Sequence, residues 1–237
     1  DDGAHNISKS KAAYPVLFRK SWNSHLSGLL SVNSYSDFLH LCKMVRNSFI
    51  ATTPDISGGG VLCLVGPSGS HKTEIAKELC EISPKFEKPI TSTTRPKRTD
   101  ETDGSYRFIS EEQFLEEQDA GRYIETTVYS KYHFGTSEEE ISPIVERGHI
   151  AVLPIDICGA LTLKILYRSR AMLVFTNRDK GNVVLDIVGR KISDEDKMRR
   201  ILSLDFEYRN AEVCDIELDV EGGAKAAAEQ IIKITNV

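Results

Sequence analysis

The chain has 237 residues, of which 40% are hydrophobic and 27% charged, and its formal net charge is −5 at pH 7. This length allows one or two domains with a substantial core, and the composition excludes a largely disordered or collagen-like chain. The negative net charge argues against a nucleic-acid partner held by bulk positive charge. No apolar run reaches the roughly 18 residues that a membrane-spanning helix needs, so we expect no membrane insertion.

The cysteine content points to a reducing compartment. The chain has five cysteines, scattered and without a CxxC pair, which argues against a disulfide framework or a zinc site. The first residues, Asp-Asp-Gly, lack the basic start and apolar run of a signal peptide. We therefore expect an intracellular protein, cytoplasmic or, if the N-terminus is a processed end, in an organelle.

Residues 1–59 differ from the rest of the chain in charge and pattern. The first 60 residues hold six Lys and Arg against four Asp and Glu, a net charge of +2, which leaves −7 for the remainder. A helix is predicted over residues 37–49, because apolar residues recur at three- and four-residue steps after a suitable N-cap, Ser36. The Thr-, Pro- and Gly-rich segment 52–60 indicates a linker. We predict an N-terminal extension over residues 1–59, which a protein partner could bind, and a domain over residues 60–237.

From residue 61 onward, short apolar runs alternate with segments of helical periodicity. Ser110 followed by Gln113 resembles a capping box and so marks the start of one helix. Alternation of this kind predicts an α/β fold with a mostly parallel sheet flanked by helices. Strands are predicted over residues 61–65, 149–155, 171–175 and 214–218, and helices over residues 74–80, 110–118, 137–147, 194–210 and 222–232.

A candidate phosphate-binding loop follows the first of these strands and opens a helix. Its backbone N–H groups and the helix N-terminus would bind phosphate. Lys72 would reach the terminal phosphates, and Thr73 would contact Mg²⁺. The candidate residues are Gly66, Ser68, Gly69, Ser70, His71, Lys72 and Thr73.

One position of this loop departs from the usual pattern. The pattern has glycine immediately before the lysine, whereas this chain has His71. Glycine suits that place because the backbone bends tightly and phosphate packs against it. We expect weakened rather than abolished nucleotide binding, because Lys72 and Thr73 are retained.

A second set of motifs lies downstream, in residues 91–136. These are TSTTRPKR at 91–98, ETDGSYRFIS at 101–110, YIE at 123–125 and HFGTS at 133–137. Together with the phosphate loop they resemble the guanylate kinase family, including the catalytically degenerate domains of membrane-associated scaffold proteins. The resemblance covers about residues 60–236. It implies a P-loop NTPase fold with a GMP-binding subdomain at about 91–136, a helical lid at about 178–200, and ATP with Mg²⁺ as cofactors of an active member.

The chemistry of the acceptor residues agrees with the resemblance. Arg95 and Arg98 can hold phosphate oxygens in bidentate fashion. A carboxylate such as Glu125 accepts from N1–H and the 2-amino group of guanine, which adenine does not offer together. The resemblance assigns the GMP site to Thr91, Arg95, Arg98, Tyr106, Glu125, Phe134, Thr136 and Asp156.

Besides His71, two further substitutions depart from the pattern of active members of the family. Phe134 replaces a tyrosine, so one hydroxyl is lost. Pro154 replaces the first Asp of an LDxD strand pattern, a carboxylate that helps to hold Mg²⁺. Catalysis would rest on Lys72 and on two cations of the lid, Arg190 and Arg200. Because phosphoryl transfer depends on positioning and charge neutralisation, we expect it to be weakened or lost.

Two functions remain open on this evidence. The first is transfer of phosphate from ATP to GMP at reduced efficiency. The alternative is a pseudokinase that serves as a protein-binding or structural subunit of a larger assembly and recognises GMP or a phosphorylated peptide in the former GMP site.

Overall fold

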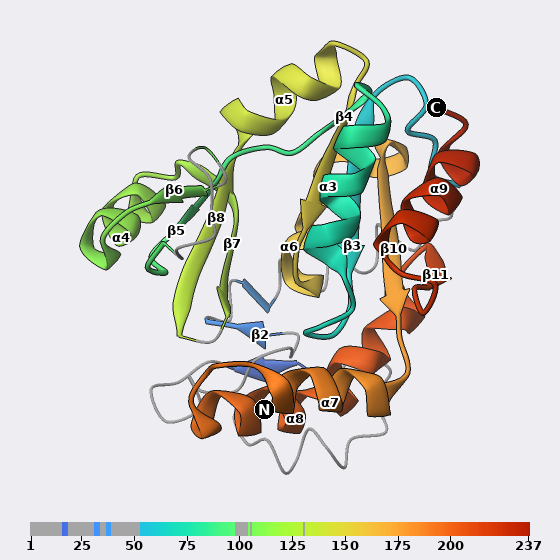
Figure 1. The fold of residues 1–237 in the computed structure, drawn as a ribbon. Coiled ribbons are helices and arrows are strands. Elements are labelled where there is room, and N and C mark those ends of the chain that lie inside the picture. Colours follow the sequence, from blue (N-terminus) through green and yellow to red (C-terminus); the bar gives the residue numbers. More distant parts are fainter. Residues whose placement is uncertain are drawn as a thin grey trace.

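The computed structural model describes residues 16–18, 31–33, 37–38, 53–97, 104, 106–129 and 131–237. A five-stranded sheet in the order β11-β10-β3-β9-β4 forms its centre, and all of its pairings are parallel (Figure 1). Its strands are β3 (Gly60–Val65), β4 (Phe86–Glu87), β9 (Ile150–Pro154), β10 (Ala171–Asn177) and β11 (Ile216–Asp219).

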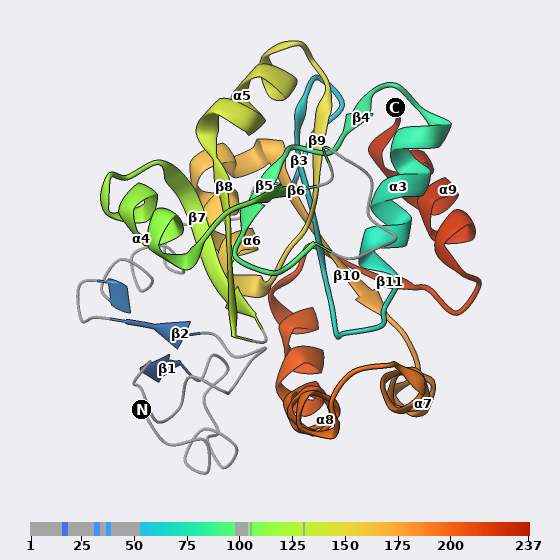
Figure 2. The ribbon, with the colours of Figure 1, turned by 60° about the vertical axis from the view of Figure 1, so that its left-hand side comes forward.

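Both faces of this sheet are covered by helices, which explains why its strands read as continuous apolar runs. Every residue of β3 is buried. Its side chains alternate: Val61 and Cys63 join one core cluster, and Leu62 joins the other. Figure 2 shows the two helical layers. They are α5 (Glu138–Glu146) and α6 (Ile157–Tyr167) on one face, and α3 (Lys72–Ile82) and α9 (Ala224–Thr235) on the other.

A second, four-stranded sheet carries the acceptor motifs. It has the order β6-β5-β8-β7 and is mixed, since β5 pairs parallel with β6 and antiparallel with β8. Gly135 allows close packing here, because a Cβ at this position would lie 2.9 Å from the Tyr123 ring. The elements are β5 (Thr91–Thr93), β6 (Tyr106–Phe108), α4 (Glu111–Asp119), β7 (Tyr123–Tyr129) and β8 (Tyr132–Ser137).

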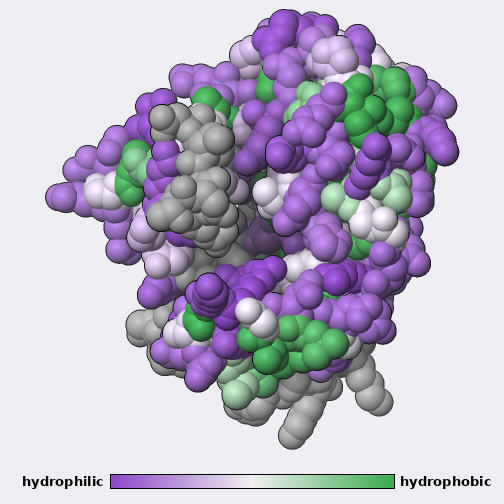
Figure 3. Space-filling view, viewed as in Figure 1, coloured by the Kyte–Doolittle hydropathy of each residue, from purple (hydrophilic) through white to green (hydrophobic). Residues whose placement is uncertain are grey.

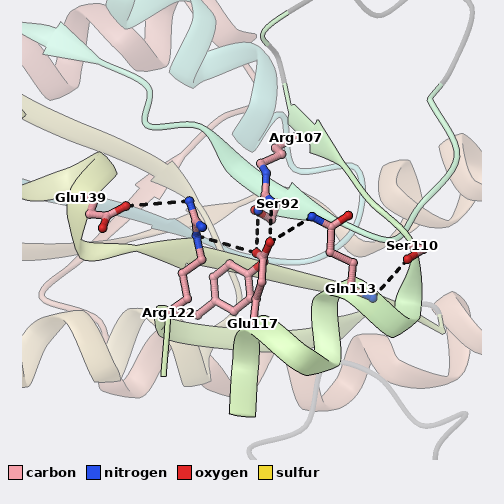
Figure 4. A network of polar contacts seen from close by, with 8 residues as sticks. Ser92, Arg107, Ser110, Gln113, Glu117, Arg122 and Glu139 are labelled. Atoms are coloured by element: carbon pink, nitrogen blue, oxygen red, sulfur yellow. Dashed lines mark hydrogen bonds and ion pairs between the residues drawn. The ribbon is translucent and has the colours of Figure 1, made fainter. Parts of the chain in front are cut away.

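A polar network centred on Glu117 ties α4 to this sheet (Figure 4). Arg107 donates to both carboxylate oxygens of Glu117, and the Tyr123 hydroxyl donates to one of them at 2.6 Å. The Arg107 hydrogen bonds lower the pKa of Glu117 to about 2, so the carboxylate stays ionised. Ser110 caps the helix by accepting from Gln113 N at 3.1 Å, while the Gln113 side chain donates to Glu117 instead of completing a capping box.

Two helices lie in the lower part of the molecule in Figure 1, α7 (Lys180–Gly189) and α8 (Asp194–Arg209). Because they span the segment predicted to form the lid, we refer to them as the lid helices. They pack through Val183, Ile187 and Leu204, all with 0% exposure. The opposite face of α7 is open, with Leu185 exposed by 70%. Figure 3 shows a hydrophobic patch in this region of an otherwise mostly hydrophilic face.

The described part of the N-terminal extension packs on the domain. A parallel pair, β1 (Leu17–Phe18) and β2 (Ser31–Val32), buries Leu17 and Val32, and Val32 belongs to the core cluster of α5 and α6. Asp37 and Phe38 are helical, and the rest of the helix predicted over 37–49 lies outside the described residues. Ile56, within the segment expected to be a linker, is only 1% exposed.

The predicted fold class is confirmed: a mostly parallel sheet is flanked by helices. The strands and helices predicted from residue 61 onward are present, with ends shifted by a few residues. The local sequence pattern did not predict β4, α6 or the strands of the second sheet, and α7 was expected only as part of the helical lid that the resemblance implies over about residues 178–200. No helix among the described residues is long and apolar enough to cross a membrane.

Candidate functional site

A cleft of about 1130 Å³ lies where the carboxyl ends of β3 and β9 face the second sheet and the lid. Such an edge is the usual ligand site of open α/β sheets. The phosphate loop, the acceptor motifs and both lid arginines line this one cleft. Of the predicted site residues, Ser70 does not line it, and Arg98 lies outside the described residues.

Ser70 and Thr176 hold the phosphate loop against the sheet. The Ser70 hydroxyl oxygen lies 2.9 Å from Pro67 O and 2.6 Å from the Thr176 hydroxyl oxygen, which in turn lies 3.1 Å from Val65 O, so the two hydroxyl protons serve this set of three contacts. A Cβ on Gly66 would lie 2.4 Å from Thr176 Oγ1, so glycine is required there. Ser70, predicted to bind ATP, thus has its side chain in the framework of the loop.

Lys72 begins helix α3 and folds back over the loop. Its Nζ donates to Gly66 O at 2.6 Å and to Pro67 O at 2.7 Å. Burial lowers the pKa of Lys72 to about 8, since desolvation penalises the ammonium. The next residue, Thr73, is exposed and lines the cleft. A bound phosphate would give Lys72 an anionic partner in place of the two carbonyls.

His71 occupies a backbone conformation that favours glycine. It is the N-cap of α3 with φ 58° and ψ 16°, in the left-handed region. For a residue with a side chain this conformation costs roughly 1–2 kcal/mol. The glycine of the usual pattern would adopt it without that cost, so His71 departs from the pattern at a position where the backbone itself favours glycine.

Two arginines of the lid segment contact the phosphate loop at Ser68. Arg200 donates to its hydroxyl at 2.7 Å and Arg190 at 3.3 Å. Arg178, which the sequence did not single out, donates to Gly69 O at 2.9 Å. The two predicted lid cations are therefore placed at the phosphate loop, where they could neutralise a phosphate.

Helix α8 also brings a carboxylate to Ser68. Glu207 is 4% exposed and accepts from Ser68 N at 3.0 Å and from the Ser203 hydroxyl at 2.6 Å. Burial raises its pKa, while the Ser203 hydrogen bond and the charge of Lys72 act in the opposite sense. The sequence gives no signal for this residue, because it lies in a helix whose other acidic residues are mostly exposed.

At the acceptor end, aromatic and cationic side chains lie side by side. The Arg95 guanidinium carbon is 5.5 Å from the centre of the Tyr106 ring, and the Phe134 ring packs edge-on to Tyr106 at 6.3 Å. Thr91 and Thr136 share a hydrogen bond of 3.2 Å between their hydroxyls. All of these predicted residues line the cleft.

Glu125 is the most unusual carboxyl group of the cleft. It is 5% exposed, and its Oε2 has no hydrogen-bond partner among the described residues. A Cβ on Gly159 would lie 2.8 Å from that oxygen, so glycine lets the first turn of α6 approach it. The pKa of Glu125 is raised to about 8, chiefly by burial; hydrogen bonds from Thr136 act in the opposite sense, and the charge of the nearby Asp156 adds to the rise. A buried acceptor of this kind is suited to a ligand that donates N–H groups.

Asp156 and Pro154 follow one another at the carboxyl end of β9. Asp156 caps α6 by accepting from Gly159 N at 2.9 Å and also accepts from the Thr127 hydroxyl. Pro154 is the last residue of the strand and offers no ligand atom on its side chain. Mg²⁺ in nucleotide sites is commonly held by one or two carboxylates and by substrate phosphates. This chain offers fewer groups that could hold Mg²⁺. Thr73 supplies a hydroxyl, whereas Pro154, at the end of β9, supplies no carboxylate.

The parallel sheet, the loop that opens α3 and the cleft above them define a P-loop nucleotide-binding fold. A family model described as "Guanylate kinase" matches residues 59–219. The guanylate kinase of Salinibacter ruber is 33% identical over 159 residues, covering 65% of this chain and 84% of that protein. That of Chlorobium luteolum is 32% identical over 143 residues, covering 60% and 73%. The crystal structure of guanylate kinase from Anaplasma phagocytophilum superposes with a TM-score of 0.62 at 25% identity, covering 76% of this chain and 86% of that one. The chain therefore belongs to the guanylate kinase family, whose active members use ATP and Mg²⁺.

Proposed function

We propose that this protein binds GMP at the acceptor end of the cleft and transfers phosphate to it from ATP only slowly. The observation that carries the proposal is the buried Glu125 carboxyl, whose Oε2 lacks a hydrogen-bond partner among the described residues. Guanine supplies two neighbouring N–H donors for a carboxylate. Arg95 and Tyr106 line the same end of the cleft and suit the phosphate of the nucleotide.

The donor end supports slow transfer rather than none. Lys72, Arg190 and Arg200 surround the loop and would neutralise charge on the transferring group. Mg²⁺, which the Thr73 hydroxyl would help to hold, would neutralise part of the charge on the donor phosphates. His71 strains the loop that must hold those phosphates, and Pro154 removes a carboxylate beside them. Both defects act on donor binding and positioning, which is where phosphoryl transfer gains its rate.

The test measures ADP formation from ATP and GMP together with GMP binding by calorimetry. We expect the parent protein to bind GMP and to turn over below about 1 s⁻¹, under the usual range of roughly 1–100 s⁻¹ for kinases. His71→Gly removes the strain and should raise both the rate and the affinity for ATP. Pro154→Asp restores a carboxylate and should raise the rate at a given Mg²⁺ concentration.

The outcomes separate the candidate functions. A parent rate within the usual range would show that the donor site is intact and would contradict the proposal. GMP binding without turnover, even in the double variant His71→Gly/Pro154→Asp, would favour the pseudokinase that recognises a ligand without phosphorylating it. Failure to bind GMP would overturn the proposal and favour a structural subunit.

A further inference from the structure

An arginine that belongs to none of the sequence motifs contacts the phosphate loop. Arg178 directly follows β10, and its Nη1 donates to Gly69 O at 2.9 Å. The same nitrogen donates to the carboxylate of Asp186 on α7, so this side chain joins the loop to a lid helix. Gly69 and Asp186 line the cleft, whereas Arg178 does not. Arg178 would therefore act on a bound phosphate through the loop and not by touching it.

The contact with Arg178 fixes one peptide group of the loop. On one side of this group, Gly69 O accepts from Arg178. On the other side, the amide of the next residue, Ser70 N, donates to Pro67 O at 3.2 Å. The C=O and N–H of a trans peptide point in opposite directions, so hydrogen bonds hold both ends of this peptide plane. The peptide between Gly69 and Ser70 is therefore restrained against rotation.

This restrained peptide comes just before the amide groups that a phosphate would use. The first N–H groups of a helix have no partner within the helix and are well placed to bind an anion. In α3 they follow His71, the N-cap, whose left-handed backbone has φ 58° and whose side chain makes no capping hydrogen bond. Such a conformation is unfavourable for a residue with a side chain. A fixed peptide on its N-terminal side limits the ways in which this turn could relax.

The environment of Arg178 does not favour a role in stability alone. Its side chain is 14% exposed, and its Nε is buried without a hydrogen-bond partner among the described residues. A buried donor that is left unpaired costs free energy. The partner in the ion pair, Asp186, is 47% exposed, and ion pairs that water can reach contribute little. The hydrogen bond to Gly69 O is the contact through which this side chain would affect ligand binding.

We propose that Arg178 is a positioning residue for the phosphates of the donor nucleotide. By holding the peptide between Gly69 and Ser70, it keeps the amide groups at the start of α3 directed into the cleft. Asp186 orients the guanidinium, and the Tyr208 hydroxyl fixes the backbone by donating to Arg178 O at 2.5 Å. This inference rests on the proposed function, since it takes the donor to be ATP.

The experiment compares the binding of ATP with Mg²⁺ and the binding of GMP, each measured by calorimetry on the full chain. Arg178→Met keeps much of the apolar stem and removes every donor, whereas Arg178→Lys keeps the charge and a donor for Gly69 O. Arg170→Met is the matched control, because Arg170 is exposed and precedes β10 at its other end.

We expect Arg178→Met to weaken ATP binding about tenfold, as for the loss of one hydrogen bond from a charged group. GMP binding should be unchanged, because the acceptor end of the cleft does not depend on this loop. Arg178→Lys should recover most of the affinity for ATP, and Arg170→Met should match the parent for both nucleotides. A purely structural role would lower the affinity for both ligands or for neither.

Three results would overturn the inference while the proposed function stands. They are an unchanged affinity for ATP in Arg178→Met, an equal loss of affinity for GMP, and a loss for ATP that Arg178→Lys does not reduce. The last result would mean that the hydrogen bond to Gly69 O is not what supports ATP binding. A parent protein that binds GMP but no ATP would instead overturn the proposed transfer, and the inference with it.

Discussion

At the level of one residue, the candidate binding group Glu125 lowers the stability of the folded protein at neutral and higher pH. Its carboxyl is buried and has a pKa of about 8, so at neutral pH the folded protein holds a proton that the unfolded chain has released. Between the unfolded pKa, near 4.3, and the folded value, the folded state binds more protons, and stability falls as pH rises. In the folded protein without ligand, Glu125 is protonated at neutral pH. A bound guanine base would instead favour the ionised carboxylate, because its N–H groups donate hydrogen bonds to it.

Affinity for GMP should therefore depend on pH. Guanine lowers the pKa of Glu125 in the complex, so binding releases a proton below about pH 8. We expect the affinity to rise from pH 6 to pH 8 and then to level off. Glu125→Gln should bind GMP at least about tenfold more weakly, because an amide presents one donor to a guanine edge that needs two acceptors. Calorimetry across this pH range measures both effects.

Glu125→Gln should also change how the thermal stability depends on pH. Glu125→Gln removes the buried ionisable group, so its midpoint of thermal unfolding should exceed that of the parent at pH 8 and approach it near pH 4.5. Glu112→Gln, at an exposed position of α4, is the control and should change neither property. A parent whose GMP affinity is flat from pH 6 to pH 8 would contradict this account of Glu125.

At the level of elements, α8 links the lid to the phosphate loop. It carries both Arg200, which donates to the Ser68 hydroxyl, and Glu207, which accepts from the Ser68 amide. Its start at Asp194 follows from Ser193, which caps the helix by accepting from Asp196 N at 3.2 Å. One helix thus positions opposite charges on a single loop residue.

Glu207→Ala should destabilise the protein by about 1–3 kcal/mol, because the buried Ser68 amide loses its acceptor, whereas the Ser203 hydroxyl still has Arg200 O at 2.9 Å. It should also weaken ATP binding by freeing the loop. Glu207→Gln keeps an oxygen acceptor and should retain most of the stability. Urea unfolding and ATP titration measure the two effects.

The control for this helix is Glu195→Ala, whose carboxylate is exposed and pairs with Arg199 on the surface. Such surface pairs contribute about 0–1 kcal/mol, so little change is expected. Equal stability of Glu207→Ala and Glu195→Ala would show that the contact with Ser68 does not hold the loop.

The helices and strands differ in how clearly the local sequence pattern predicts them. Helix α8 follows the N-cap Ser193 and is rich in charged residues, whereas α6 is apolar around most of its circumference and lacks a helical period. The strands β7 and β8 contain Thr, Tyr and His instead of an apolar run. Their pairing depends on contacts across the second sheet that no local pattern records.

At the level of the whole molecule, the motifs of the cleft could be read from the sequence, but their neighbours could not. The phosphate loop and the acceptor residues have fixed local spacing. Lys88 and Glu207 line the same cleft from a connection and a helix, and Arg178, which follows β10, donates to the loop at Gly69 O; only the tertiary fold brings these residues there. The departure at His71 was visible in the sequence, whereas its left-handed backbone was not.

The extension is joined to this fold through buried apolar contacts. Val32 is 5% exposed and belongs to the core cluster of α5 and α6, and Phe18 and Phe38, whose ring centres lie 5.7 Å apart, pack against the same cluster. Leu17, with 0% exposure, pairs with Ser31 in the β1–β2 ladder. The sequence around Leu17 shows only weak periodicity, so this packing was not predicted. It implies that the extension and the domain unfold together.

Leu17→Ala should therefore reduce the free energy of unfolding by about 2–4 kcal/mol, the usual loss for a fully buried leucine. Leu185→Ala removes the same atoms from a side chain that is 70% exposed and should change it by less than about 0.5 kcal/mol. Chemical unfolding monitored by circular dichroism should show one transition for both variants. A Leu17→Ala protein as stable as Leu185→Ala would mean that the extension does not contribute to the stability of the domain.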